Sequence, residues 1–131
     1  MAELTCIVVT PETTALEETA DFVALPLDDG EIGIMPGRAP LIGRLGYGEL
    51  RIKTGGKVSR YYVDGGFVQV ADNVVSVLTN RAVPADRVNG TTATEQLEAA
   101  FQRRATTAEE EQIRDRLIAQ SRAQIRLATR K

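Results

Sequence analysis

The sequence contains no histidine and only one cysteine, Cys6, and these absences exclude several kinds of site. Without histidine there is no Ser-His-Asp or Cys-His catalysis and no metal site with a histidine ligand. A single cysteine cannot form an internal disulfide or a multi-cysteine zinc site, which fits a reducing compartment. Cys6 lies in the strand-like run Leu4–Val9, so we expect a buried, unreactive thiol.

Aromatic residues, long apolar runs and excess charge are also scarce. Three tyrosines, three phenylalanines and no tryptophan are a poor supply for an aromatic-lined ligand pocket. No apolar run approaches the ~20 residues of a membrane span, and no signal peptide is recognisable, so we expect a soluble protein. The net charge of −2 gives no general attraction to nucleic acid or anionic lipid.

Charge differs between the two parts of the chain. Residues 1–91 carry 8 basic and 12 acidic side chains, a net charge of −4, whereas residues 92–131 carry 8 basic and 6 acidic ones, a net charge of +2. A basic C-terminal segment beside an acidic body can rest on that body or leave it for another acidic partner.

Residues 4–80 show the two-residue apolar period of β-strands. Strands are expected at Leu4–Val9, Phe22–Leu27, Leu50–Lys53, Val58–Val63, Phe67–Ala71 and Val74–Leu78. Tight hairpins are expected at Gly55-Gly56 and Asp72-Asn73, and turns with positive φ at Asp28–Gly30 and Asp64–Gly66. Pro26 favours an edge position for its strand. Eight to ten short strands at this spacing indicate an antiparallel β-sandwich or a flattened barrel.

After Leu78 the pattern predicts two helices, at about residues 93–104 and 108–129. Thr92 with Glu95, and Thr107 with Glu110, fit capping boxes at the N-termini. The predicted apolar stripes are Ala93, Leu97, Ala100 and Phe101 on the first helix, and Ile113, Leu117, Ile118, Ile125, Leu127 and Ala128 on the second. Two such helices form an antiparallel hairpin, which must pack on the sandwich, on a partner, or on each in turn.

The most distinctive stretch is Gly30–Pro40, which reads GEIGIMPGRAP. Glycine permits backbone angles that are closed to other residues, while proline restricts the backbone, and the apolar residues between them anchor it. The composition therefore predicts a stiff surface loop that holds Glu31 and Arg38 out to solvent as a contact surface.

Three motifs together resemble the epsilon-subunit family of F-type ATP synthases, called delta in mitochondria. The first is Gly30–Pro40 followed by Leu41, similar to the family's G-E-[IL]-G-[IL]-x-P-G-H-A-P-L loop. The second is Tyr62–Val70, YVDGGFVQV, and the third is Asn73–Leu78, NVVSVL; they are similar to the family's Y-x-V-x-G-G-[FIV]-x-[EQ]-V and N-V-V-T-V-L. Because their order and the helical hairpin agree too, the resemblance covers nearly the whole chain.

The resemblance implies an N-terminal β-sandwich of about ten strands in residues 1–84, a linker in residues 85–91 and a regulatory helical hairpin in residues 92–131. It implies no catalytic residue, cofactor or metal, but a rotor subunit of the central stalk. This subunit would bind the gamma subunit and couple its rotation to the ring of c subunits in proton-driven ATP synthesis. The implied c-ring contacts are Glu31, Met35, Arg38, Leu41 and Ile42. Arg38 stands where the family usually has histidine, which makes the charge permanent.

A second implied activity is inhibition of ATP hydrolysis by the hairpin, which would extend along gamma toward the alpha and beta subunits. The basic surface would come from Arg103, Arg104, Arg114, Arg116, Arg122, Arg126 and Arg130. The alternative is that these arginines are only the solvated faces of two exposed helices.

Candidate nucleotide sites are weak. Some family members bind ATP through an [IL]-D-x-x-R-A motif, but here Asn89 replaces the acid and Thr92 replaces the arginine. The main cation available to phosphate is therefore missing, and no nucleotide binding is expected. Thr54–Lys57 lacks the spacing of a P-loop and is interpreted as a hairpin turn.

Three acids, Asp28, Asp29 and Glu31, are interpreted as a solvated turn rather than a calcium site. Tyr61 and Tyr62 point to opposite faces of a strand and do not form a platform for sugar or nucleic acid. A different interpretation of the whole chain is a free-standing β-sandwich module that binds a small ligand or peptide and dimerises through its helical arm. The family interpretation implies no nucleic-acid partner and peripheral attachment, through the complex only, to the cytoplasmic face of a bacterial plasma membrane or to the stromal face of the chloroplast thylakoid.

Overall fold

The computed structural model describes residues 3–129 as two compact units, which divide between Pro84 and Ala85. The first unit, the sheet domain, contains eight strands in a single sheet. The second unit, the helical hairpin, contains a short 3-10 helix, η1 (Ala85–Arg87), followed by two α-helices. The two units have different periodicities in the sequence, which is why the change of pattern after Leu78 marked their division.

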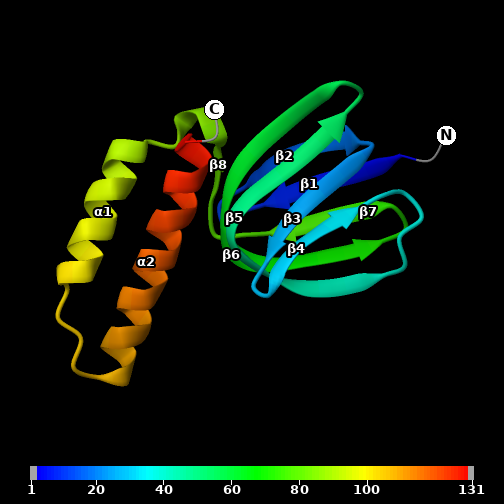
Figure 1. Cartoon of the computed structure of the whole chain (residues 1–131). Helices are drawn as coiled ribbons and strands as arrows, with labels where there is room; N and C mark the ends of the chain where they lie inside the picture. The colour runs from blue at the N-terminus through cyan, green and yellow to red at the C-terminus, as the bar shows by residue number, and fades with distance from the viewer. Residues whose placement is uncertain (1–2, 130–131) are drawn as a thin grey trace. The chain divides into compact units, whose positions relative to one another are not determined.

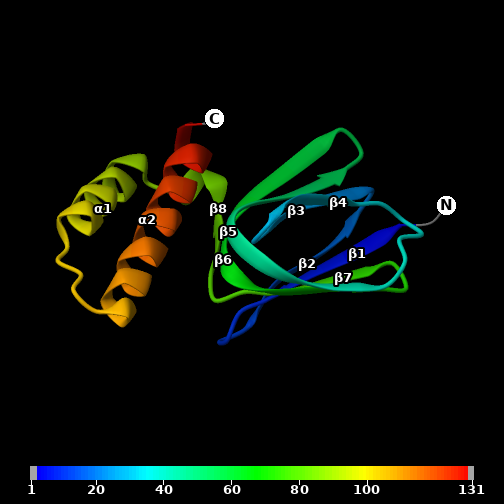
Figure 2. The ribbon, with the colours of Figure 1, turned by 60° about the horizontal axis from the view of Figure 1, so that its bottom comes forward.

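The strands are β1 (Leu4–Val9), β2 (Thr14–Ala20), β3 (Phe22–Leu27), β4 (Gly30–Ile34), β5 (Leu41–Thr54), β6 (Lys57–Ala71), β7 (Val74–Leu78) and β8 (Ala82–Pro84). Their order is β2-β1-β7-β6-β5-β3-β4, and β8 pairs with β6 outside this path. All pairs are antiparallel except β1 with β7, which run parallel, so the predicted antiparallel architecture is confirmed with one parallel pair in it. The long strands β5 and β6 curve, and the sheet folds over itself so that β3 and β4 face β1, β2 and β7 (Figures 1 and 2).

The core lies between these two layers. In β1 the side chains of Leu4, Cys6 and Val8 are fully buried, whereas the residues between them are only partly covered. Equivalent inward residues of β3, β5, β6 and β7 complete one apolar cluster. The alternation that predicted strands therefore also predicts which side chains enter the core.

Two expected strands, Val58–Val63 and Phe67–Ala71, are parts of the single strand β6. Gly65 and Gly66 have φ of +71° and +112°, as predicted, but they bend the strand rather than end it. The pairing of β5 with β6 keeps one register on both sides of this point, from Leu45↔Gly66 to Tyr47↔Asp64, and skips only Gly46 and Gly65 between them. A bend within a strand and a turn between strands both favour glycine with positive φ, so the residues alone do not separate them. This continuity is one reason why there are eight strands rather than about ten.

Pro26 does not lie on an edge strand, because β3 lies between β4 and β5. The pairing of β3 with β5 is interrupted between Ala24 and Leu27, and this gap contains the proline, which has no N–H to donate. On β5, a Cβ added to Gly48 would lie 2.8 Å from Pro26 Cβ, so glycine allows the two strands to approach there.

In the helical hairpin, α1 (Gly90–Gln102) begins three residues before the predicted start, and α2 (Ala108–Thr129) begins and ends where predicted. The N-cap of α1 is Asn89, whose Oδ1 accepts from Thr92 N at 3.1 Å, so the predicted capping box at Thr92 is wrong. At α2 the Thr107 hydroxyl accepts from Glu110 N at 3.1 Å and donates to the Glu110 carboxylate at 3.0 Å. The predicted cap at Thr107 is confirmed.

The buried side chains of the hairpin are mostly small. Ala93 and Ala100 of α1 and Ala123 and Leu127 of α2 are buried, while Phe101 is 54% exposed and its predicted inward position is wrong. A Cβ added to Gly90 would lie 3.2 Å from Ala128 Cβ, which shows how closely the two helices approach at that end. Small residues permit this close packing. The sequence pattern placed large apolar residues such as Phe101 at the helix contact, whereas the buried side chains there are mostly alanines.

Candidate functional site

The predicted stiff loop is shorter than expected, because its first half forms the strand β4 and only residues 35–40 lie outside the strands. A turn at Pro36-Gly37 has φ of +86° at the glycine, which is the pattern of a type II turn. Gly37 N–H donates to Asn73 Oδ1 at 2.8 Å. Asn73 belongs to the β6–β7 hairpin turn, so a segment 36 residues away in sequence holds this loop in place.

The five residues expected at this contact surface differ in exposure and in the contacts they make. Met35 is 63% exposed and Ile42 is 78% exposed, and Arg38 is also exposed. Leu41 is half-buried and packs against the core. Glu31 lies four residues before Met35, about 13 Å away along β4 and its continuation. Met35, Arg38 and Ile42 are therefore the residues of this set that a partner can contact at the loop.

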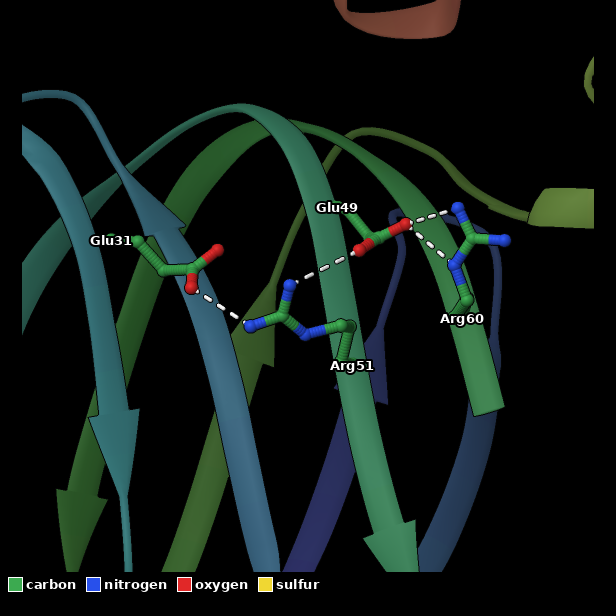
Figure 3. Close-up of polar contacts among 4 residues, drawn as sticks. All are labelled: Glu31, Glu49, Arg51 and Arg60. Carbon is green, nitrogen blue, oxygen red and sulfur yellow. Dashed lines mark hydrogen bonds and ion pairs between the residues drawn. The ribbon is translucent and has the colours of Figure 1, made fainter. Parts of the chain in front are cut away.

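Glu31 instead belongs to a ladder of charges across β4, β5 and β6 (Figure 3). The Arg51 guanidinium lies between two carboxylates, 2.8 Å from Glu31 Oε1 and 3.4 Å from Glu49 Oε1. Arg60 Nε donates to the other oxygen of Glu49 at 2.6 Å. Glu49 is only 7% exposed, and these two arginines compensate for the loss of water around its charge. The ladder ties the strand β4 to the middle of the sheet.

A continuous row of side chains crosses the outer face of the sheet domain. Strand pairing places Arg44 opposite Phe67, Phe67 opposite Leu78, and Leu78 opposite Val9. Phe67 is 53% exposed and Leu78 is 48% exposed, and the Arg44 guanidinium lies 5.7 Å from the centre of the Phe67 ring. We call this row the apolar outer face. Ile42 is two residues before Arg44 on β5 and points to the same side of the sheet.

A groove of about 550 Å³ runs along the apolar outer face. Its walls include Val9 at the end of β1, Pro11 after that strand, Tyr47 on β5, and Phe67 and Leu78. Exposed apolar side chains that gather on one face, beside a single arginine, are typical of a protein-interaction surface. The groove can receive the apolar side of a partner, and Arg44 can pair with an acidic residue beside it.

Sequence reasoning missed this groove and the charge ladder. One signal was present: Val74, Val75, Val77 and Leu78 are apolar at both alternate positions of β7. An apolar residue on each face of a strand predicts that both faces are covered, one by the core and the other by a partner. No comparable local signal connects Glu49 with Arg60, because their contact depends on the register of β5 and β6.

The arginines expected to inhibit lie in the connection after α1 and along α2. Arg103 and Arg104 lie in the connection after α1, and both are exposed. On α2, Arg116, Arg122 and Arg126 are exposed, while Arg114 is half-buried and lies 3.7 Å from Asp115. The Arg122 guanidinium covers the Phe101 ring at 5.4 Å. Arg130 lies outside the described residues.

Other candidate sites have structural roles. The Tyr62 hydroxyl donates to Asp64 Oδ1 at 2.8 Å, and Tyr62 is buried. Gly55 and Gly56 form the predicted hairpin turn, where Gly55 N–H donates to Asp21 Oδ2. Within residues 3–129 there is no group of three or more acidic or cysteine side chains that could hold a metal ion. In the same range, neither α1 nor α2 has the length and apolarity that a bilayer crossing requires.

Burial determines the chemistry of Cys6. Removal from water, and secondly the nearby Glu18 carboxylate, raise the pKa of the Cys6 thiol from 9.0 to about 12. A thiol with this pKa is protonated at neutral pH and is a weak nucleophile. The prediction of a buried Cys6 is confirmed.

Comparison with known proteins gives consistent matches. Residues 3–85 match the family described as ATP synthase, Delta/Epsilon chain, beta-sandwich domain. An ATP synthase epsilon chain of Rhodopirellula baltica is 53% identical over 121 residues, which is 92% of this chain and 94% of the relative. One from Desulfitobacterium hafniense is 48% identical over 82 residues, 63% of this chain and 62% of the relative.

Two solved structures share the fold. A chain of the Euglena gracilis mitochondrial ATP synthase superposes with a TM-score of 0.85 at 22% identity, covering 94% of this chain and 79% of that chain. A chain of the central stalk and c ring of the Tetrahymena thermophila mitochondrial ATP synthase gives 0.74 at 15% identity, covering 95% and 96%. The arrangement of a folded-over sheet followed by two helices is thus shared over nearly the whole chain.

Proposed function

This chain belongs to the ATP synthase delta/epsilon chain family, and we propose that it is the rotor subunit that links the gamma subunit to the ring of c subunits in the central stalk. An epsilon chain is a non-catalytic subunit of ATP synthase, so the chemistry of ATP synthesis takes place on other chains. The function of this chain is to provide contact surfaces that stay in register while the rotor turns. The observation that carries this proposal is that the exposed Met35 and Ile42 border a loop that the bond from Gly37 N–H to Asn73 holds to the β6–β7 turn.

The apolar outer face is the proposed gamma contact. Phe67 and Leu78 lie directly opposite each other on β6 and β7, and both are about half exposed. At ~25 cal/mol per Å² of apolar surface, covering such side chains stabilises a complex by a few kcal/mol. An amphipathic helix of gamma, with an acidic residue facing Arg44, has the complementary chemistry.

The loop end is the proposed c-ring contact. Met35 and Ile42 supply apolar surface, and Arg38 supplies a charge that does not titrate near neutral pH. Of the other two residues proposed earlier, Leu41 fixes the loop to the core and Glu31 fixes β4 through Arg51. They would support the contact from behind.

The coupling proposal is tested in the assembled complex with Ile42→Asp. The result expected is less proton pumping for each ATP hydrolysed, because a charge replaces an apolar contact. Val58→Asp is the matched control, since Val58 is also an exposed apolar residue (45%). It lies near the start of β6, whereas Ile42 pairs with Gln69 near the end of that strand. Normal pumping by Ile42→Asp would overturn the c-ring contact.

The hairpin is proposed to inhibit ATP hydrolysis through its arginines, by docking on acidic segments of alpha and beta. The support is that all of them among residues 3–129 except Arg114 are exposed. Truncation after Asn89 should raise the ATPase rate of the complex, and an Arg116→Gln/Arg126→Gln pair should raise it partly. An unchanged rate after truncation would show that the hairpin does not inhibit.

The proposed location is the cytoplasmic face of a bacterial plasma membrane, reached through the complex only, and the bacterial origin of the two similar epsilon chains favours this over the thylakoid. The alternative of a free-standing binding module makes a different prediction. Under the rotor proposal the chain co-purifies with a gamma partner, whereas the module would be recovered with a soluble ligand or as a self-dimer.

A further inference from the structure

Asn73, in the β6–β7 turn, accepts hydrogen bonds from two different segments of the chain. Its backbone carbonyl accepts from Thr5 N–H, at the start of β1, at 2.9 Å. Its side-chain Oδ1 accepts from Gly37 N–H at 2.8 Å. One residue therefore joins β1, the β6–β7 hairpin and the loop of residues 35–40.

The backbone conformation explains how Asn73 can reach both partners. Asp72 and Asn73 have φ of +52° and +61°, which is the left-handed region used by two-residue hairpin turns. Asparagine tolerates this region better than most residues with a side chain, and glycine, which tolerates it best, has no side-chain acceptor. Asparagine and aspartate are thus the residues that suit both the turn and the bond to Gly37.

The hydrogen bond from Gly37 to Asn73 fixes the loop that carries the exposed residues to the rest of the sheet domain. Residues 35–40 connect β4 to β5, and β4 is tied to the sheet by the Glu31–Arg51 ion pair. Within the loop, Gly37 N–H donates to Asn73 Oδ1. Without it, the loop between its two strands would be held mainly by the stiffness of Pro36 and Pro40.

We propose that Asn73 is a positioning residue, which holds the loop of Met35 and Arg38 in place so that force applied to the loop is passed to β6, β7 and β1. This inference rests on the proposed c-ring contact of the same loop. The inference explains how the loop keeps its position under load. A hydrogen bond between residues 36 positions apart in sequence holds the loop at Gly37, where otherwise only its two ends would be attached to strands.

The test uses three variants of one turn. Asn73→Gly keeps the left-handed backbone but removes the acceptor, Asn73→Asp keeps an acceptor, and Asp72→Gly changes the neighbouring turn residue. The amide-exchange rate of Gly37 in the isolated full chain, measured by NMR, should rise about 2- to 12-fold in Asn73→Gly, the range that one hydrogen bond gives. It should change little in the other two variants.

Proton pumping per ATP hydrolysed is then measured in the assembled complex, with Ile42→Asp as a reference. The proposal expects reduced pumping in Asn73→Gly and normal pumping in Asn73→Asp and Asp72→Gly. An unchanged Gly37 exchange rate overturns the proposal whatever the pumping shows. Faster exchange of Gly37 with normal pumping in Asn73→Gly also overturns the proposal for Asn73. In that case, poor pumping by Ile42→Asp shows that the c-ring contact still stands. Normal pumping by Ile42→Asp shows that the c-ring contact fails as well.

Discussion

The carboxylate of Glu49 is the most deeply buried charge among the described residues of the sheet domain. It bonds to Arg60 on the next strand and faces Arg51 on its own strand, and both guanidinium groups are partly exposed. A charge at 7% exposure is stable only when its partners replace the water it has lost. Removal of the Glu49 charge takes a carboxylate away from both arginines, while Arg51 keeps its ion pair with Glu31.

Glu49→Gln should lower the free energy of unfolding by about 1–2 kcal/mol, less than for a fully buried pair because the arginines reach solvent. Urea denaturation of the full chain measures this. Glu31→Gln is the matched control from the same ladder, and because Glu31 is 51% exposed its cost should stay below about 1 kcal/mol. Equal costs for the two variants would show that burial of Glu49 has no energetic consequence.

The Cys6 thiol should make the stability of the protein depend on alkaline pH. Its pKa is raised from 9.0 to about 12 in the folded state, so between these values the unfolded chain loses a proton that the folded chain keeps. Stability from this group is complete below pH 9 and is lost as the pH rises toward 12, by up to about 1.4 kcal/mol per pH unit.

Cys6→Ala removes this dependence. Comparison of urea denaturation curves of the two proteins between pH 8 and pH 10.5 should show a steeper loss of stability in the unmodified chain. Parallel curves would contradict the assigned pKa, whatever the difference in absolute stability caused by the smaller alanine side chain.

At the scale of elements, alternation and turn residues predicted much of the sheet. β1, β3 and β7 have the predicted bounds, and the hairpin turns at Gly55 and Asp72 are where expected. β2 was missed because its sequence, TALEETA, has few apolar residues, and its identity as a strand depends on pairing with β1. Pairing partners lie far apart in the sequence, so local pattern carries little information about an edge strand.

The bend in β6 at Gly65 and Gly66 gives an element-scale prediction. A Cβ added at Gly66 would overlap the Leu78 carbonyl oxygen, and φ there is +112°, so Gly66→Ala requires β6 and β7 to separate. The expected loss is at least about 3 kcal/mol of unfolding free energy. Gly56→Ala is the control, because a Cβ there meets nothing within 4 Å and its loss should stay below about 1 kcal/mol. A small effect at Gly66 would show that glycine is not required for the bend.

At the scale of the whole molecule, the chain contains a rigid sheet domain and a hairpin with few large buried side chains. The sheet domain encloses a core contributed by seven of its strands, whereas the hairpin buries mostly alanines. Motif resemblance predicted the family, and glycine and proline positions predicted a loop at Gly30–Pro40, of which residues 35–40 lie outside the strands. The apolar outer face and the hydrogen bond from Gly37 to Asn73 were not predicted, because both depend on which strands lie side by side rather than on neighbouring residues.

Binding to the gamma subunit tests the account most directly. Calorimetry measures the affinity of the full chain for purified gamma. We expect the two proteins to form a stable complex. Phe67→Asp, which places a charge in the groove, should weaken it at least about tenfold, while Val58→Asp should bind as the unmodified chain does. Absence of binding by the unmodified chain, or undiminished binding by Phe67→Asp, would contradict the account.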